Sequence, residues 1–322
     1  MPREIKNVVI VGASGTLGPP ILSALKSTTL NVAVISRPDS SATFPSDTKV
    51  IKSDTSYDSL LAAFRSHSTD AVICLVGGRA LKEQFSMIDA AVDAGVARFV
   101  PSEFGANTAD ERVRDLVTMT YKQRKEVTEY LQKKSEEKGG EFGWTGVVSG
   151  PFFDWGLETG FLGFDIPNRH AKILDSGTVP FATTNLEDVG KCLANILTNH
   201  SMLESTANQY IYIATYVCRQ KTLLSVLEKI TGEPWKVERE HSKQVISKFK
   251  EKLLGGDIAA QLPLVKVAGW GERELGDFTQ IDGGLWNEKL GMKPAETGIE
   301  ALEADVRRIV QNVKGEATYY TP

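Results

Sequence analysis

The chain has 322 residues, 41% of them hydrophobic, with 37 Lys and Arg against 41 Asp and Glu and a net charge of −4. At about 100–200 residues per domain, this length suits one large or two modest domains with a substantial buried core. The absence of a clustered basic excess argues against a nucleic-acid-binding protein. The apolar run near the N-terminus, residues 8–11, is far shorter than the roughly 20 residues of a membrane span, so we expect neither a span nor a signal peptide.

The cysteine and histidine patterns give no sign of a disulfide framework or a metal centre. Cys74, Cys192 and Cys218 are odd in number and far apart. They predict buried free thiols in a reducing compartment, hence a cytoplasmic protein. The four histidines are scattered and have no adjacent cysteine, so we expect no metal site.

Up to about residue 150, short β-branched runs alternate with amphipathic segments. The predicted strands are residues 5–11, 32–35, 50–51, 71–76, 98–100 and 144–148, and the predicted helices are residues 17–26, 59–66, 81–94 and about 111–138. Apolar strands separated by helices are typical of βαβ units and a parallel sheet covered on both faces. Residues 1–150 are therefore predicted to form a doubly wound α/β domain.

After residue 150 the strand–helix alternation loosens. Glycine, proline and aromatic residues crowd residues 151–167, and the remaining predictions are helices at 186–198, 221–230, 244–254 and 298–313 and one strand at 210–217. This texture favours a smaller α+β lobe over residues 151–322, partly interleaved with the sheet.

Gly12, Gly15 and Gly18 form a G-x-x-G-x-x-G turn between the first predicted strand and the first predicted helix. In such turns one glycine permits the tight bend, one lets the backbone approach a pyrophosphate, and one lets helix and strand pack closely. The N–H groups at the helix start then hold the anion. The turn predicts a dinucleotide site, a tight turn without a ligand being the alternative.

The second predicted strand leads into Ser36 and Arg37. About 20 residues beyond the glycine turn, NAD sites place an acidic residue for the ribose hydroxyl, whereas an arginine suits a 2′-phosphate. Asp39 is a competitor, but Pro38 separates it from the strand and it begins a serine-rich loop. The pattern therefore favours NADP(H).

The glycine turn, Ser36 and Arg37, the FVPSEFG segment at 99–105 and the SGPFF segment at 149–153 together resemble the NmrA-like and isoflavone reductase-like family of atypical short-chain dehydrogenases/reductases. The resemblance is specific over the N-terminal half and weaker beyond it. It implies a Rossmann fold with a small substrate lobe, NADP(H) binding and reduction of aromatic secondary metabolites. Some members of the family are instead redox-sensing regulators that bind the dinucleotide without turnover.

The resemblance also assigns cofactor-binding residues, which follow the carboxyl ends of predicted strands, where open α/β sheets bind ligands. They are Gly12, Ser14, Gly15, Thr16, Leu17 and Gly18 at the pyrophosphate, Arg37 at the 2′-phosphate, Asp54 toward the adenine, Val76 and Gly77 under the cofactor, and Ser102, Phe104 and Phe152 near the nicotinamide. Phe153, Trp155 and Phe161 follow as candidates for binding an aromatic substrate, core packing being the alternative.

Reductases of this family carry a catalytic lysine in the helix after the SEFG turn, and the same register holds Arg124 here. Arginine, with a pKa above ~12, cannot act as a general base near neutral pH. Tyr121 and Lys125 offer a second register, Y-x-x-x-K, in which both side chains share a helix face and the lysine would lower the tyrosine pKa. Lys122 is a further catalytic candidate, and solvated helix charges are the alternative interpretation.

The sequence therefore predicts an NADPH-dependent reductase of an aromatic small molecule, acting as a monomer or homodimer without a nucleic-acid or membrane partner. The alternative is an NADP-binding redox sensor, which Arg124 motivates.

Overall fold

A 7-stranded sheet organises the first of two lobes in the computed structural model, which describes residues 4–295 and 298–313. The strand order is β10-β6-β5-β4-β1-β2-β3, and every neighbouring pair is parallel. The strands are β1 (Asn7–Val11), β2 (Asn31–Ser36), β3 (Lys49–Lys52), β4 (Ala71–Cys74), β5 (Arg98–Val100), β6 (Gly143–Val148) and β10 (Gln209–Tyr212). The order reverses at β1, which pairs with both β2 and β4, so the ligand-binding crevice of such a sheet lies beyond the end of β1.

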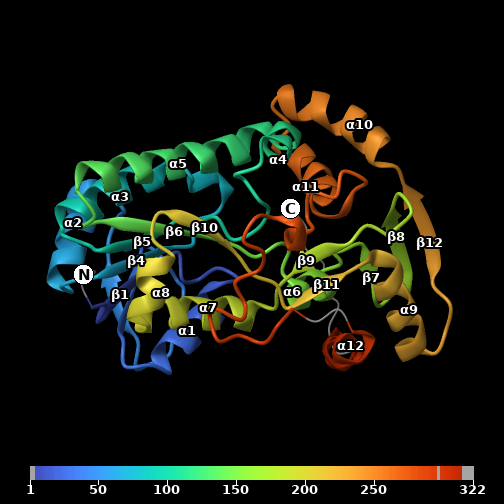
Figure 1. Ribbon diagram of the computed structural model, residues 1–322, viewed down its shortest axis with the longest axis horizontal. Coiled ribbons are helices and arrows are strands. Elements are labelled where there is room, and N and C mark those ends of the chain that lie inside the picture. The colour runs from blue at the N-terminus through green and yellow to red at the C-terminus, as the bar shows by residue number, and fades with distance from the viewer. Residues whose placement is uncertain (1–3, 296–297, 314–322) are drawn as a thin grey trace.

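Helices cover both faces of this sheet (Figure 1). One layer contains α1 (Gly18–Lys26), α7 (Leu186–Thr198) and α8 (His200–Ser205), and the other contains α2 (Tyr57–Ser66), α3 (Glu83–Asp93) and α5 (Thr118–Glu137). In β1, Val8 and Ile10 pack toward the first layer, while Val9 and Val11 pack toward the second. Because both faces are buried, the strand is apolar from Val8 to Val11, and the predicted doubly wound Rossmann-type fold is confirmed.

The second lobe is built beside the carboxyl ends of the strands. Its helices are α4 (Glu111–Leu116), α6 (Phe153–Glu158), α9 (Gln220–Thr231), α10 (Ser242–Leu254), α11 (Gln261–Trp270) and α12 (Ile299–Val313). Three short 3-10 helices are η1 (Gly78–Ala80), which follows β4, η2 (Ile258–Ala260), which precedes α11, and η3 (Phe278–Gln280), which follows α11. Its strands form a 3-stranded sheet of β7 (Phe164–Asp165), β8 (His170–Leu174) and β12 (Lys236–Glu240) and a 2-stranded sheet of β9 (Phe181–Thr183) and β11 (Tyr216–Cys218). The two halves interleave, since β10, α7 and α8 complete the first lobe while α4 packs into the core of the second.

Two predicted elements are wrong in extent. The helix expected over residues 111–138 breaks at Val117, which has φ −116° and ψ 69° and is fully buried in the core of the second lobe. The strand expected over residues 210–217 is two strands in different sheets. The segment changes its hydrogen-bonding partner after Ile213. The N–H of Ile213 donates to the carbonyl of Val148 in the large sheet, whereas the N–H of Thr215 donates to the carbonyl of Thr183 in the small one. Helix α11 escaped prediction because Pro263 and Gly269 interrupt it and no single apolar stripe marks it.

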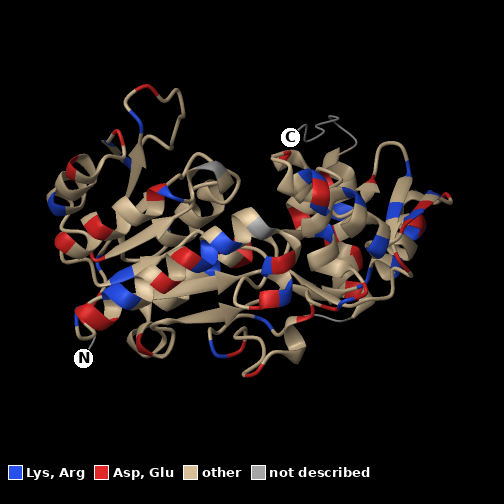
Figure 2. Ribbon diagram, turned by 90° about the horizontal axis from the view of Figure 1, so that it is seen from above, with Lys and Arg blue, Asp and Glu red and all other residues tan. Residues whose placement is uncertain are grey.

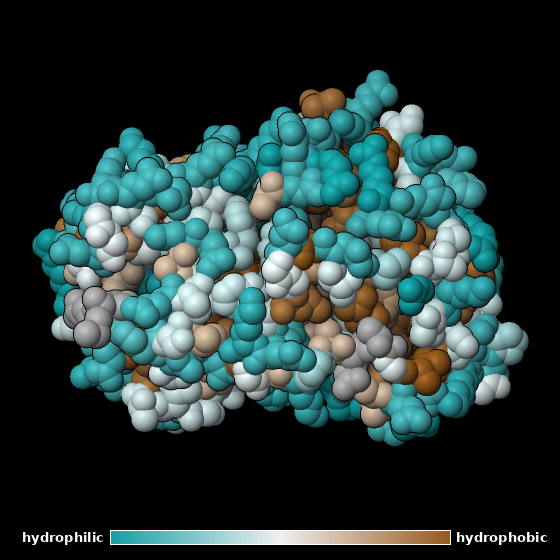
Figure 3. Space-filling model, viewed as in Figure 1, coloured by the Kyte–Doolittle hydropathy of each residue, from teal (hydrophilic) through white to brown (hydrophobic). Residues whose placement is uncertain are grey.

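The surface mixes both signs of charge over both lobes (Figure 2). On the face shown in Figure 3, apolar residues gather over the middle and the second lobe, and polar residues dominate the sheet lobe. Across the described residues, no helix combines the length and apolar character needed to cross a bilayer. Cys74, Cys192 and Cys218 are all free and buried, as predicted.

Candidate functional site

The glycine turn lies at the carboxyl end of β1, at the point where the strand order reverses. Gly12 has φ +84°, and a Cβ there would lie 3.0 Å from the backbone carbonyl of Leu75. A Cβ on Gly18 would overlap the backbone carbonyl of Ala13. The packing of the chain itself therefore requires glycine at the first and third positions of the motif.

Gly15 differs from the other two glycines. The nearest heavy atom to a Cβ added there is 3.6 Å away, an ordinary contact, so nothing in the protein's own packing excludes a side chain. The N–H groups of Thr16 and Leu17 have no acceptor in the part of the chain that the structure describes. Pro19 and Pro20 open α1 without N–H groups, so the N–H groups of Thr16 and Leu17 are the donors next to the helix start that an anion can reach. Exposed donors beside an unfilled space fit the pyrophosphate of a dinucleotide.

Two cations meet at the ends of β2 and β3. Arg37 is exposed directly after β2, and Lys52 at the end of β3 donates from Nζ to the Ser36 hydroxyl (3.3 Å) and the Arg37 carbonyl (3.2 Å). Lys52 was missed by sequence reasoning because it lies on another strand, and only the pairing of Ser36 with Lys52 brings it here. Two positive charges suit a 2′-phosphate better than a ribose hydroxyl.

Asp54 is exposed beyond β3 and begins the turn into α2. Its carboxylate accepts from the backbone N–H of Ser56 (3.0 Å) and from the Ser56 hydroxyl (2.6 Å). These bonds hold the pKa of Asp54 below its usual value. The carboxylate is thus ionised and fixed at neutral pH, near the place assigned to the adenine.

The ends of β4, β5 and β6 are tied together at the other side of the crevice. The Ser102 hydroxyl donates to the Val76 carbonyl (2.8 Å), and the N–H of Gly150 donates to the Gly105 carbonyl (2.9 Å). Gly77 is exposed, with no atom within 4 Å of an added Cβ, whereas Phe104 packs in the core under the sheet end. The two hydrogen bonds hold the ends of these strands together at the bottom of the crevice, and the space above Gly77 is open.

Glu103 lies beneath the turn that follows β5. Its side chain is buried, and its carboxyl accepts from the Thr108 hydroxyl (2.6 Å). Burial raises the pKa of Glu103, while the positive charges of Arg124 and Lys125 oppose that rise. The charges of two cationic side chains of α5 therefore act on this buried carboxyl.

The candidates on α5 point in different directions. Arg124 donates from Nη1 to the Glu103 carbonyl (2.9 Å), and its guanidinium lies 5.9 Å from the centre of the Tyr121 ring. Lys125 reaches toward Glu129 (3.8 Å), and Lys122 is exposed. The cation that contacts the turn after β5 is therefore Arg124, and no contact among the described residues joins Tyr121 to Lys125.

The Tyr121 phenol is not activated in the way that the sequence led us to expect. Its ring is buried in the core of the second lobe, and burial raises its pKa to about 12. The cation that opposes this rise is Arg124 rather than a lysine. The phenol therefore keeps its proton throughout the neutral range.

A row of aromatic rings leads from the end of β6 into the second lobe. Measured between ring centres, Phe152 lies 6.5 Å from Trp155, Trp155 lies 5.3 Å from Phe161, and Phe161 lies 5.9 Å from Trp270. Trp270 was missed because its helix is more than 100 residues away in the sequence. Phe153 is fully buried and packs in the core of the second lobe.

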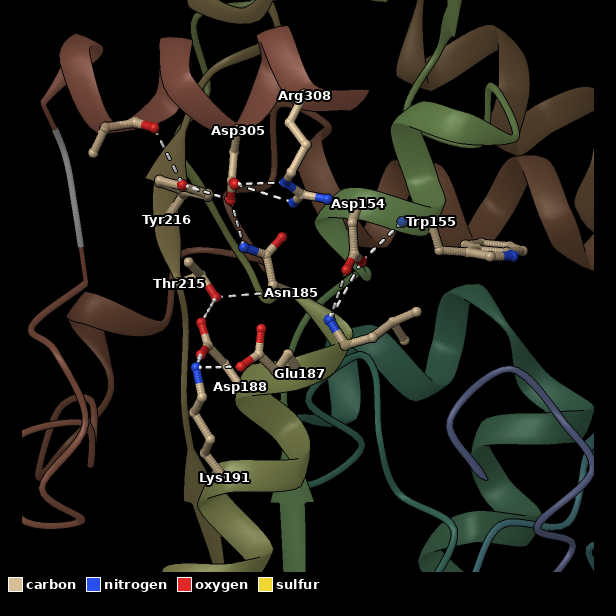
Figure 4. Close-up of polar contacts among 12 residues, drawn as sticks. Asp154, Trp155, Asn185, Glu187, Asp188, Lys191, Thr215, Tyr216, Asp305 and Arg308 are labelled. Carbon is tan, nitrogen blue, oxygen red and sulfur yellow. Dashed lines mark hydrogen bonds and ion pairs between the residues drawn. The ribbon is translucent and has the colours of Figure 1, made fainter. Parts of the chain in front are cut away.

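A second polar cluster fixes the C-terminal helix α12 (Figure 4). Asp305 accepts from Asn185 (2.6 Å), Tyr216 (2.9 Å) and Arg308 (3.0 Å). Asp154 accepts from the first N–H of α7 (3.1 Å), so it acts as a helix cap. A cavity of about 980 Å³ lies beside this cluster between α1, α7 and α12. These hydrogen bonds connect α6, which also carries Trp155 of the aromatic row, to α7, and α7 to α12.

Known proteins resemble this chain in sequence and in fold. The model of the NmrA-like family matches residues 4–263. A protein named oxidoreductase aprR, from Aspergillus flavus, is 38% identical over 232 residues, which are 72% of this chain and 76% of that protein. Oxidoreductase poxI from Penicillium oxalicum is 31% identical over 263 residues, or 81% and 82% of the two chains.

The solved structure of leucoanthocyanidin reductase with NADPH, from Vitis vinifera, superposes with a TM-score of 0.75 at 17% identity and covers 94% of this chain and 99% of that one. At that identity the likeness concerns the fold. The match over residues 4–263, joined to the glycine turn, the SEFG turn and the interleaved second lobe, confirms the resemblance seen in the sequence: the chain belongs to the NmrA-like family.

Proposed function

We propose that this protein is a cytoplasmic NADPH-dependent reductase that reduces a carbonyl or a conjugated double bond of an aromatic small molecule. The observation that carries the proposal is the glycine turn, in which Gly15 leaves space beside two free N–H groups at the switch point of the sheet. The names of the relatives, both oxidoreductases, support the reaction class. Buried free cysteines support a reducing compartment.

The roles of the chain at the cofactor follow from the contacts. Thr16 and Leu17 hold the pyrophosphate through their N–H groups, and Arg37 with Lys52 holds the 2′-phosphate. The bound nicotinamide supplies the hydride. The bond from Ser102 to the carbonyl at the end of β4 keeps the floor beneath it in place.

On the substrate side, Phe152, Trp155 and Phe161 offer ring faces to a flat aromatic molecule. Lys122 and Lys125 remain the proposed sources of a proton, because both are accessible to solvent on α5. Tyr121 is proposed to support this end of the helix from below, with its phenol protonated.

The test is a fluorescence titration of the purified protein with NADPH and with NADH, followed by NADPH oxidation at 340 nm against aromatic aldehydes, ketones and enones. We expect NADPH to bind at least tenfold more tightly than NADH and at least one class of acceptor to be reduced. No binding of either dinucleotide would refute the proposal.

A second function is favoured by one observation. The cation at the turn after β5 is an arginine, which cannot exchange a proton near neutral pH. A redox sensor without turnover needs no proton donor, but it does need different affinities for NADP⁺ and NADPH, since a ligand shifts an equilibrium only through differential affinity. Tight binding with no turnover, and at least a fivefold preference for one redox form, would favour this function.

A further inference from the structure

Arg124 has an unused hydrogen-bonding edge. Nη1 donates to the Glu103 carbonyl (2.9 Å), Nε is buried with no acceptor, and Nη2 makes no hydrogen bond within the described residues. In a guanidinium group Nη1 lies on the side of Cδ, so the Nε–H and one Nη2–H point in parallel from the opposite edge. Two parallel donors of this kind match the two oxygens of a carboxylate.

Arg124 lies on the part of α5 that borders the crevice. One helical turn before Arg124, the Thr120 methyl lies 3.8 Å from a Cβ added to Gly78, just beyond β4. The Thr120 hydroxyl donates to Gln261 at the start of α11 (2.6 Å). Arg124 itself contacts the turn after β5. Its guanidinium therefore lies where the sheet ends, α5 and the second lobe meet, beside the nicotinamide end of the proposed cofactor site.

No carboxylate of the described chain pairs with this edge. The charge of Arg124 acts on Glu103, but the carboxyl of Glu103 binds Thr108, and Arg124 contacts only the Glu103 backbone carbonyl. A buried N–H left without an acceptor costs about 1–3 kcal/mol, so it needs a reason. An anchored guanidinium with one edge occupied by the backbone and the other edge unpaired is suited to an anionic ligand.

We propose that Arg124 binds a carboxylate of the substrate, which places the substrate among aromatic carboxylic acids. This inference rests on the proposed function, because it uses the same crevice. Nη1 holds the guanidinium in position, and the Nε–Nη2 edge takes both carboxylate oxygens. Arg124 orients the substrate and moves no proton.

The test compares two probes of equal shape, trans-cinnamate and cinnamamide, titrated calorimetrically into the protein saturated with NADP⁺. The wild type should bind cinnamate at least tenfold more tightly than cinnamamide. Arg124→Gln should remove that preference and leave cinnamamide affinity unchanged, whereas Arg124→Lys should keep part of it, since charge remains but the fork is lost. Lys133→Gln, on the exposed part of α5 and paired with Glu137, is the matched control and should behave as wild type.

The comparison of acid with amide separates binding from a merely structural role, because a damaged site would weaken both probes alike. Equal affinity of the two probes for the wild type, failure of the wild type to bind either at 5 mM, or a preference that survives Arg124→Gln would each overturn the inference. Reduction of neutral aldehydes without any acid preference would overturn it while the reductase proposal stands. An acid preference in a protein that oxidises no NADPH would support it while the reductase proposal fails.

Discussion

The contrast between Gly15 and Gly18 gives the sharpest test of the cofactor site. In the free protein an alanine at Gly15 meets only an ordinary contact of 3.6 Å, while an alanine at Gly18 overlaps the carbonyl of Ala13. One substitution should therefore affect the ligand and the other the fold, although both replace a glycine of the same motif by the same residue.

For Gly15→Ala we expect a change in unfolding free energy of less than about 1 kcal/mol, because the methyl group fits and the unfolded chain loses some freedom. The methyl group occupies the space that a pyrophosphate needs in order to reach the N–H groups of Thr16 and Leu17. Losing two hydrogen bonds to charged oxygens, at about 1.5 kcal/mol each, amounts to about 3 kcal/mol. That loss weakens NADPH binding roughly 100-fold.

For Gly18→Ala we expect a loss of about 3 kcal/mol or more in unfolding free energy, since the backbone of α1 must move away from that of Ala13. In a chain of this size such a loss lowers Tm by roughly 5 °C or more. The assays are thermal unfolding followed by circular dichroism and NADPH titration followed by fluorescence. Wild-type NADPH affinity in Gly15→Ala would refute the reasoning, as would wild-type stability in Gly18→Ala.

Three further predictions concern single charged groups. Lys52→Gln should weaken NADPH binding about tenfold, as loss of one charge-assisted contact does, and leave NADH binding unchanged in the same titration. The control is Lys49→Gln, because the Nζ of Lys49 contacts His67 instead. An equal loss of affinity for both dinucleotides would contradict the assignment. Because burial raises the pKa of Glu103 in the folded protein, its charge lowers stability as the pH rises above about 4.3. The urea midpoint of Glu103→Gln should therefore rise relative to that of the wild type between pH 4 and pH 7. A difference between the two midpoints that does not change with pH would refute this prediction. Burial alone would raise the pKa of Asp305, but hydrogen bonds lower it overall, so the stabilisation by the Asp305 carboxylate is full above about pH 4 and lost at lower pH. Asp305→Ala should therefore lower the free energy of unfolding by about 2–3 kcal/mol at pH 7 and by less at pH 3. A pH-independent loss in urea unfolding would contradict this prediction.

The local patterns of the chain were sufficient for the class of fold and for proposing half of the candidate site. Apolar strands alternating with helices predicted the parallel sheet, and glycine spacing with Arg37 marked one end of the crevice. These features are encoded within one βαβ unit, so reading them requires no knowledge of distant contacts. The same reasoning merged β10 and β11 into one strand, because the change of partner after Ile213 has no local signal.

What the sequence by itself determined is the doubly wound sheet, the dinucleotide turn and the absence of a lysine at the position of Arg124, since each is a matter of residue type and spacing. Tertiary structure alone decided that Lys52 contacts the backbone of Arg37, that Trp270 extends the aromatic row and that one edge of Arg124 has no acceptor among the described residues. The physical reason is that these contacts depend on strand register and on the packing of α5 and α11 against the sheet ends. Such relations join residues far apart in the chain, and no periodicity within a segment records them.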